Sequence, residues 1–117
     1  MVNHSRDRKG LDPVKLNVRL SRDARHHSRV MVRRDRVFDP KHLAALLKPY
    51  NWSFGGDAVA CDSSLFRLHR DFMRDPVHRS ILMSSEVRRV GIGVVVTTGK
   101  TSCGRGTNYW VTEIFYG

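Results

Sequence analysis

The segment from residue 65 to residue 94 constrains the fold of this chain more than any other. Its first part has apolar residues at helical spacing, namely Leu65, Leu68, Phe72 and Met73, which predicts an amphipathic helix. The Asp-Pro pair at 75–76 is typical of a helix N-cap followed by the first helical residue, so a second helix is expected over 77–83. The glycine-punctuated apolar run that begins at residue 90 predicts a strand over 90–98 with both faces covered.

The rest of the sequence, outside residues 65–94, predicts three further helical segments and two further strands. They are a short helix or frayed arm over 1–10, a long helix over 14–35, a short helix over 42–47, and strands over 57–61 and 109–116. The long helix has the clearest signal, because Leu20, Ala24 and Met31 recur on one stripe together with Ser28. A length of 117 residues suits one core, and no linker divides the chain, so we expect a single domain over 1–117.

The chain is strongly basic, with 21 Lys and Arg residues against 11 Asp and Glu and a net charge of +10. Such an excess attracts polyanions such as nucleic acid, anionic lipid or acidic cell-wall polymers. Five arginines recur on one face of the long helix: Arg22, Arg25, Arg29, Arg33 and Arg36. We interpret this basic ridge as a solvated face rather than a nucleic-acid contact, because no interleaved aromatic residue is available for base stacking.

Five segments follow one another along the chain: Gly-Leu-Asp-Pro-Val at 10–14, the first long helix over 20–31, Asp-Pro-Val-His-Arg at 75–79, Val-Gly-Ile-Gly-Val at 90–94 and Tyr-Trp-Val-Thr-Glu-Ile-Phe at 109–115. In this order they resemble the CAP superfamily, which contains the cysteine-rich secretory proteins, insect venom antigens and plant pathogenesis-related-1 proteins. The chain resembles bacterial members most. The resemblance implies an α+β fold, namely a three-layer α-β-α sandwich with a small antiparallel sheet.

The resemblance also implies a cleft, where eukaryotic CAP members carry two histidines and two glutamates and several bind a divalent metal. Every one of these four positions is altered in this chain. The altered set and its neighbours give a candidate cleft cluster of Asp39, His42, Asp57, Asp75, His78 and Trp110. Trp110 occupies the position of the second histidine, and the carboxylates fall at Asp57 and Asp75.

Two interpretations of this cluster remain open. Residues His42, Asp57 and Asp75 are candidate ligands for a divalent metal, or could share a proton for acid–base chemistry. Alternatively, Asp75 is only a helix cap and Asp57 only accepts backbone hydrogen bonds. We favour these structural roles, because aspartate is one methylene shorter than glutamate and metal–oxygen bonds tolerate only a few tenths of an ångström.

We therefore predict a non-catalytic CAP domain that binds a lipid-like or anionic ligand, or a partner at the cell surface. The alternative is a metal-assisted, peptidase-like hydrolase that uses the cleft cluster. A third possibility is polyanion or nucleic-acid binding through the basic ridge. The altered tetrad argues against the hydrolase, and nucleic acid is supported by charge alone.

The two cysteines, Cys61 and Cys103, are too few for a cysteine-based zinc site but enough for one disulfide. If their strands share one sheet, the pair could approach within bonding range, and we favour a bridge over two free thiols. The N-terminal residues have no apolar core and so do not form a signal peptide. We expect an extracellular or cell-surface location if an upstream signal was removed, and a cytoplasmic one otherwise.

Overall fold

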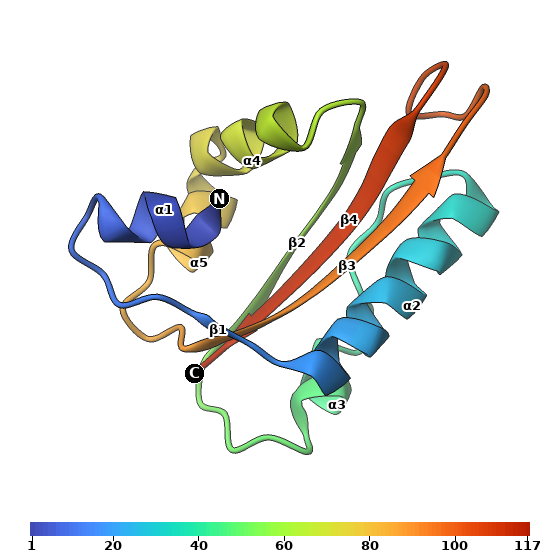
Figure 1. Ribbon diagram of the computed structural model, residues 1–117. Coiled ribbons are helices and arrows are strands. Elements are labelled where there is room, and N and C mark those ends of the chain that lie inside the picture. The colour runs from blue at the N-terminus through green and yellow to red at the C-terminus, as the bar shows by residue number, and fades with distance from the viewer.

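A four-stranded sheet lies between two layers of helices in the computed structural model, which describes residues 1–117 (Figure 1). The strands are β1 (Lys15–Leu16), β2 (Gly55–Asp62), β3 (Arg89–Thr97) and β4 (Asn108–Tyr116), in the order β1-β3-β4-β2. Strand β4 pairs antiparallel with both β2 and β3 along their length. This arrangement confirms the α+β sandwich.

The edge strand β1 differs from the prediction, because residues 14–17 were assigned to the long helix. In the structure β1 runs parallel to β3, and the backbone N–H groups of Lys15 and Asn17 donate to the carbonyls of Arg88 and Val90. The helix begins only at residue 18, where the Asn17 side chain accepts a hydrogen bond from the N–H of Leu20 at 2.9 Å. The N-cap therefore sets the boundary between strand and helix.

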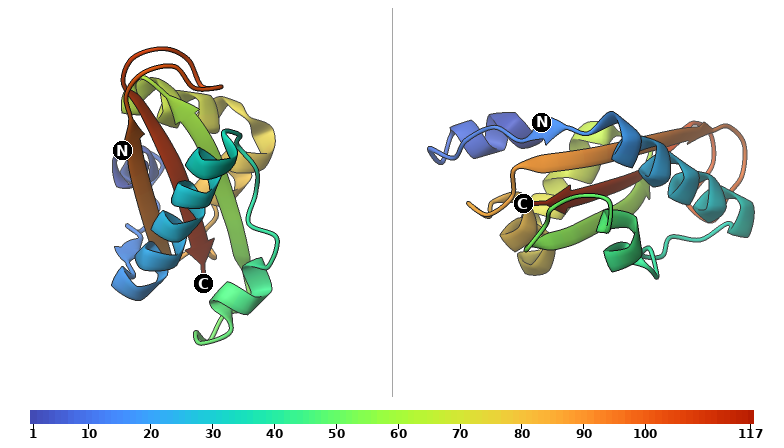
Figure 2. Two further views of the ribbon diagram at one scale, coloured as in Figure 1. Left: turned by 90° about the vertical axis from the view of Figure 1, so that its right-hand side faces the viewer. Right: turned by 90° about the horizontal axis from the view of Figure 1, so that it is seen from below.

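One helical layer consists of α2 (Val18–Arg34) and α3 (Leu43–Leu47) (Figure 2). The long helix α2 packs so closely on β3 that a Cβ added to Gly93 would overlap the backbone of Ala24 and Arg25. The buried hydroxyl of Ser28 completes this contact, since it donates to the carbonyl of Gly93 at 3.0 Å and lies 2.8 Å from the hydroxyl of Thr112. This face of the sheet is in direct contact with helix backbone.

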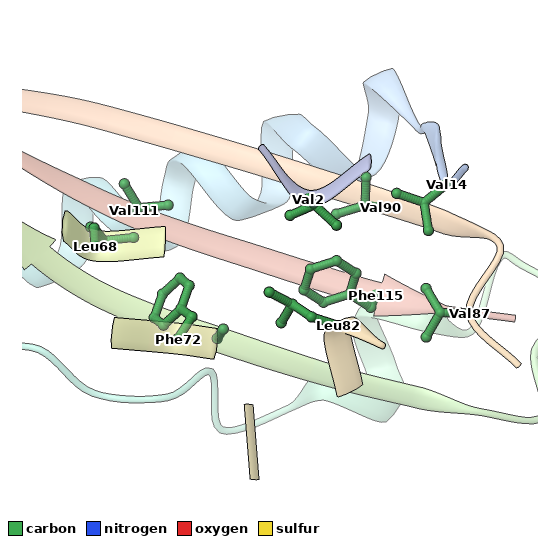
Figure 3. Close-up of a cluster of buried hydrophobic side chains, with 10 residues drawn as sticks. Val2, Val14, Leu68, Phe72, Leu82, Val87, Val90, Val111 and Phe115 are labelled. Carbon is green, nitrogen blue, oxygen red and sulfur yellow. The ribbon is translucent and has the colours of Figure 1, made fainter. Parts of the chain in front are cut away.

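The other helical layer consists of α1 (Val2–Asp7), α4 (Leu65–Arg74) and α5 (Pro76–Leu82). Ser64 caps α4 through the N–H of Arg67, and Asp75 caps α5 as the Asp-Pro pair predicted. Side chains from these helices meet the sheet in the largest apolar cluster of the protein (Figure 3). Its members are Val2, Val14, Ala58, Leu68, Phe72, Leu82, Val87, Val90, Val111 and Phe115.

Helix α1 is an integral part of this layer, so the short helix and not the frayed arm describes the first ten residues. Its Arg6 side chain is 1% exposed. The guanidinium donates to four backbone carbonyls, at distances of 2.8–3.3 Å, and these belong to Asp12, Leu82, Ser84 and Val87. The guanidinium thereby fastens the start of the chain to the turn that precedes β3.

Candidate functional site

Asp57 lies on β2 and faces the α2 side of the sheet. Side chains alternate along a strand, and the next residue, Ala58, belongs to the cluster on the opposite face, whereas Val59 packs with Met31. The Oδ2 atom of Asp57 is buried and receives no hydrogen bond from a donor group. Burial, followed by the neighbouring carboxyl of Asp39, raises the pKa of Asp57 to about 7. The carboxyl groups of Asp57 and Asp39 therefore form one acidic pair on this side of the sheet.

The other candidate carboxylate, Asp75, lies in the opposite layer at the junction of α4 and α5. Its Oδ1 atom accepts the N–H groups of Val77 and His78 at 2.9 and 3.3 Å. Its Oδ2 atom lies 3.7 Å from Nδ1 of His78, whose ring stacks edge-on against Phe72. This geometry makes Asp75 and His78 a second, separate pair.

The two remaining candidates join neither pair. His42 precedes α3 and is exposed, whereas Trp110 is fully buried and donates from Nε1 to the hydroxyl of Thr97 at 2.9 Å. No three His, Cys, Asp or Glu side chains are close enough to hold a metal ion, so the structure does not assemble His42, Asp57 and Asp75. The physical reason is that the sheet separates Asp57 from Asp75.

Cys61 and Cys103 are joined in a disulfide, with their Cα atoms 6.0 Å apart. Cys61 lies on β2 opposite Trp110, and Cys103 lies in the loop between β3 and β4. Both pack against the small cluster of Met31, Val59 and Trp110. The bond therefore fastens the β3–β4 loop to β2 on the α2 face.

Four arginines of the basic ridge lie on the outer surface of α2, and Arg36 follows the end of this helix. All five arginines of the ridge are exposed, and none takes part in an ion pair. The guanidinium of Arg36 lies over the ring of Phe38, 5.0 Å from its centroid. None of the helices combines the length and apolar character needed to cross a membrane.

Sequence reasoning missed a mainly apolar cavity of about 370 Å³ under the α1 and α4 helices. We call it the α1–α4 cavity. Ten of its thirteen lining residues are hydrophobic. They include Val2 of α1, Leu65 and Leu68 of α4, and Val90, Ile92 and Val94 of β3. Its volume is at the lower end of the range of about 300–1,000 Å³ that is usual for small-molecule sites.

Two ionisable side chains also line the α1–α4 cavity. Glu113 of β4 is 8% exposed, and its Oε1 atom is buried without a hydrogen-bond partner. Burial raises the pKa of Glu113 to about 7, although the N-terminal ammonium opposes this shift. His69 of α4 has its Nε2 atom 2.9 Å from the hydroxyl of Ser5, and burial lowers the pKa of this imidazole.

A signal for Glu113 was present in the sequence. In the predicted strand over 109–116, Glu113 shares one face with Tyr109, Val111 and Phe115. An acidic residue within an apolar strand face is unusual, because burying a carboxylate without a partner is unfavourable. This pattern could have marked the position as a candidate for a binding site, but Glu113 was not among the site residues predicted from the sequence.

The sequence profile of the family described as "CAP: Cysteine-rich secretory protein family" matches residues 1–115. The chain belongs to the CAP family. No curated protein sequence matches this CAP domain at a significant level.

Solved structures similar to this CAP domain come from several bacteria. An extracellular protein of Bacillus anthracis that contains an SCP domain has a TM-score of 0.77 and 19% identity, with 98% of this chain and 37% of that protein covered. An outer surface protein of Borrelia burgdorferi has a TM-score of 0.76 and 14% identity, with 98% and 85% covered. A cysteine-rich secretory protein of Staphylococcus aureus has a TM-score of 0.70 and 23% identity, with 98% and 35% covered. The chain thus spans little more than a third of the Bacillus protein, and these likenesses show the fold alone.

Proposed function

We propose that this CAP domain is a non-catalytic binding module that takes a lipid-like ligand into the α1–α4 cavity. The observation that carries the proposal is the cavity itself, which is mainly apolar and large enough for a small molecule. Burial of a ligand's apolar surface there provides the driving force for binding. The exposed side chain of Leu16 and the N-terminal Met1 also line the cavity, so it has an apolar rim.

The positions of the candidate site residues support a binding role over a hydrolytic one. Asp39 with Asp57 and Asp75 with His78 are two pairs in different layers, so neither provides an acid, a base and a metal ligand in one place. General acid–base catalysis needs its groups within hydrogen-bond reach of one reacting centre. A ligand-binding role makes no such demand on these residues.

We further propose that the domain acts outside the cell or at its surface. Two of the similar structures are described as an extracellular protein and an outer surface protein. The Cys61–Cys103 disulfide supports the same location, because disulfides persist in oxidising compartments. The exposed basic ridge would then face anionic polymers or lipid head groups.

The test compares two substitutions on the same face of β3. Val94→Phe places a ring in the α1–α4 cavity, whereas Val96→Phe adds the same ring at a position that is 53% exposed and does not line it. We expect Val94→Phe to weaken the binding of decanol, measured by calorimetry, by at least about tenfold, and Val96→Phe to leave it within about twofold. Equal binding by the wild type and the Val94→Phe variant, or no binding by the wild type, would contradict the proposal.

A further inference from the structure

The α1–α4 cavity contains one buried acidic group whose hydrogen-bonding capacity is unused. Glu113 is paired across the sheet with Ile92 of β3 and Ala58 of β2, and on its own strand Val111 and Phe115 flank it on the same face. None of these side chains can donate a hydrogen bond. Glu113 lines the cavity and its Oε1 atom has no partner, so the carboxyl group is available to a donor group bound in the cavity.

The other polar side chains of the cavity are already engaged. Asn3 uses both ends of its amide on the backbone of Val14, at 2.8 and 3.1 Å. The His69 ring is bonded to the hydroxyl of Ser5. No lysine or arginine is among the lining residues, although the chain is rich in both. An anionic head group would therefore meet a carboxyl group, and the cationic groups at the cavity are the N-terminal ammonium of Met1 and the engaged imidazole when it is protonated.

We propose that the α1–α4 cavity selects amphiphiles with a primary ammonium head group, which pairs with Glu113 while the apolar chain lies along β3. This inference rests on the proposed ligand-binding function and specifies its ligand class. An ammonium group supplies the charge and the hydrogen bonds that a buried carboxylate lacks. The unpaired carboxylate is unfavourable in the free protein, so pairing it on binding favours this ligand class over a neutral one.

The proposal has a defined pH dependence. The ammonium pairs with the ionised form of Glu113, which becomes the major form as the pH rises through about 7. The charged group near Glu113 is the N-terminal ammonium at α1, and the other ionisable lining group is His69 on α4, whose pKa is lowered by burial. Strands β1, β2 and β3 contribute no charged lining residue. Loss of the His69 charge on raising the pH acts in the same direction, so His69→Gln is needed to separate the two groups.

The experiment measures the affinities of decylamine, decanol and decanoic acid for the full chain by calorimetry at pH 6 and pH 8. We expect decylamine to bind at least about tenfold more tightly than decanol at pH 8, and decanoic acid to bind most weakly. The preference for the amine should shrink at pH 6. Glu113→Gln, which keeps the shape of the side chain, should remove the preference for decylamine over decanol and its pH dependence. His69→Gln should keep the preference.

The outcomes separate this inference from the proposed function. If decanoic acid binds as tightly as decylamine, or if Glu113→Gln leaves the ratio of amine to alcohol affinity unchanged, the head-group inference is wrong and the cavity remains a lipid site. If none of the three probes binds to the wild type, both the inference and the proposed function are wrong. Circular dichroism of the Glu113→Gln variant checks that it is folded.

Discussion

The two faces of the central sheet are packed in different ways. On one face, Gly91 and Gly93 of β3 let the backbone of α2 rest directly on the strand. On the other face, the alternating residues Ile92 and Val94 of the same strand line a cavity under α1 and α4. Helix contact with glycine leaves no room for a ligand, whereas branched side chains project from the strand and form the wall of a cavity. A single strand therefore carries both the contact surface for α2 and one wall of the cavity.

The largest expected loss of stability comes from adding a side chain where α2 and β3 are in direct contact. Gly93→Ala places a Cβ on the helix backbone of Ala24 and Arg25, which cannot move away without shifting α2. We expect a loss of more than about 4 kcal/mol in the free energy of unfolding, above the usual 1–3 kcal/mol for overpacking. Urea denaturation measures this loss. A loss below about 1 kcal/mol would show that the two faces do not differ as described.

Removal of the disulfide tests how much this covalent link on the α2 face contributes to the free energy of unfolding. The bond between Cys61 and Cys103 spans a sequence separation of 42 residues. The chain-entropy model predicts a stabilisation of roughly 3–4 kcal/mol for a loop of this length, with native strain reducing it. We expect Cys61→Ser with Cys103→Ser to unfold at correspondingly lower urea concentration. Mass spectrometry of the unreduced, alkylated wild type checks the bond, and two alkylated cysteines would contradict it.

On the cavity face, the stability of α1 depends on Arg6. Replacing Arg6 with Met removes the donor to the four carbonyls at 12, 82, 84 and 87 and leaves them to find new partners. We expect a loss of about 3 kcal/mol, because unsatisfied buried polar groups are costly. The matched control is Arg8→Met at the exposed end of the same helix, which should change stability by less than about 0.5 kcal/mol. Equal effects of the two variants would contradict the role of Arg6.

Glu113, on the cavity face of the sheet, makes the stability of the folded protein depend on pH. Its pKa is about 7 in the folded protein against an ordinary value of 4.5, so its ionisation disfavours the folded state. The penalty is absent below about pH 4.5 and is complete above pH 7, where it reaches about 3 kcal/mol. We expect wild-type stability to fall between pH 5 and pH 8, and Glu113→Gln to lack this part of the fall. Asp57→Asn removes the corresponding contribution of the other face, since the pKa of Asp57 is raised in the same direction.

The smallest effect is expected from Val94→Ala, one residue away from Gly93 on the opposite face. Val94 is half-buried at the cavity wall, so its truncation removes few contacts and enlarges an existing space. We expect a loss of about 1 kcal/mol or less. Denaturation of Val94→Ala and Gly93→Ala under the same conditions compares the two faces directly. If Val94→Ala and Gly93→Ala lower the free energy of unfolding equally, the two faces of the sheet are not packed differently.

The elements with local signals were predictable from the sequence. Helix α4, the Asp75 cap and strands β3 and β4 follow from spacing within short windows, and the structure places each within about two residues of its predicted bounds. Strand β1 was not predictable in this way, because two residues carry no periodicity and their hydrogen-bond partners lie more than 70 positions away.

The site was less predictable than the fold, since it depends on how the elements are placed in space. Resemblance to the CAP family grouped Asp57 with Asp75, but strand alternation and the N-cap role put them on different sides of the sheet. The burial of Arg6 could not be predicted, because its neighbours along the chain are polar and basic. Only Glu113 had a local signal, an acid on an apolar strand face, and its meaning depended on a cavity formed by α1 and α4.

The contacts of Arg6 also have a consequence for the order in which the chain assembles. Three of the carbonyls that it binds lie 76, 78 and 81 positions further along the sequence. A helix of six residues is marginal by itself, so α1 gains a stable position only after the turn over 82–87 has formed. During synthesis, α1 therefore leaves the ribosome well before the turn that holds it, and the wall of the cavity is completed late in folding.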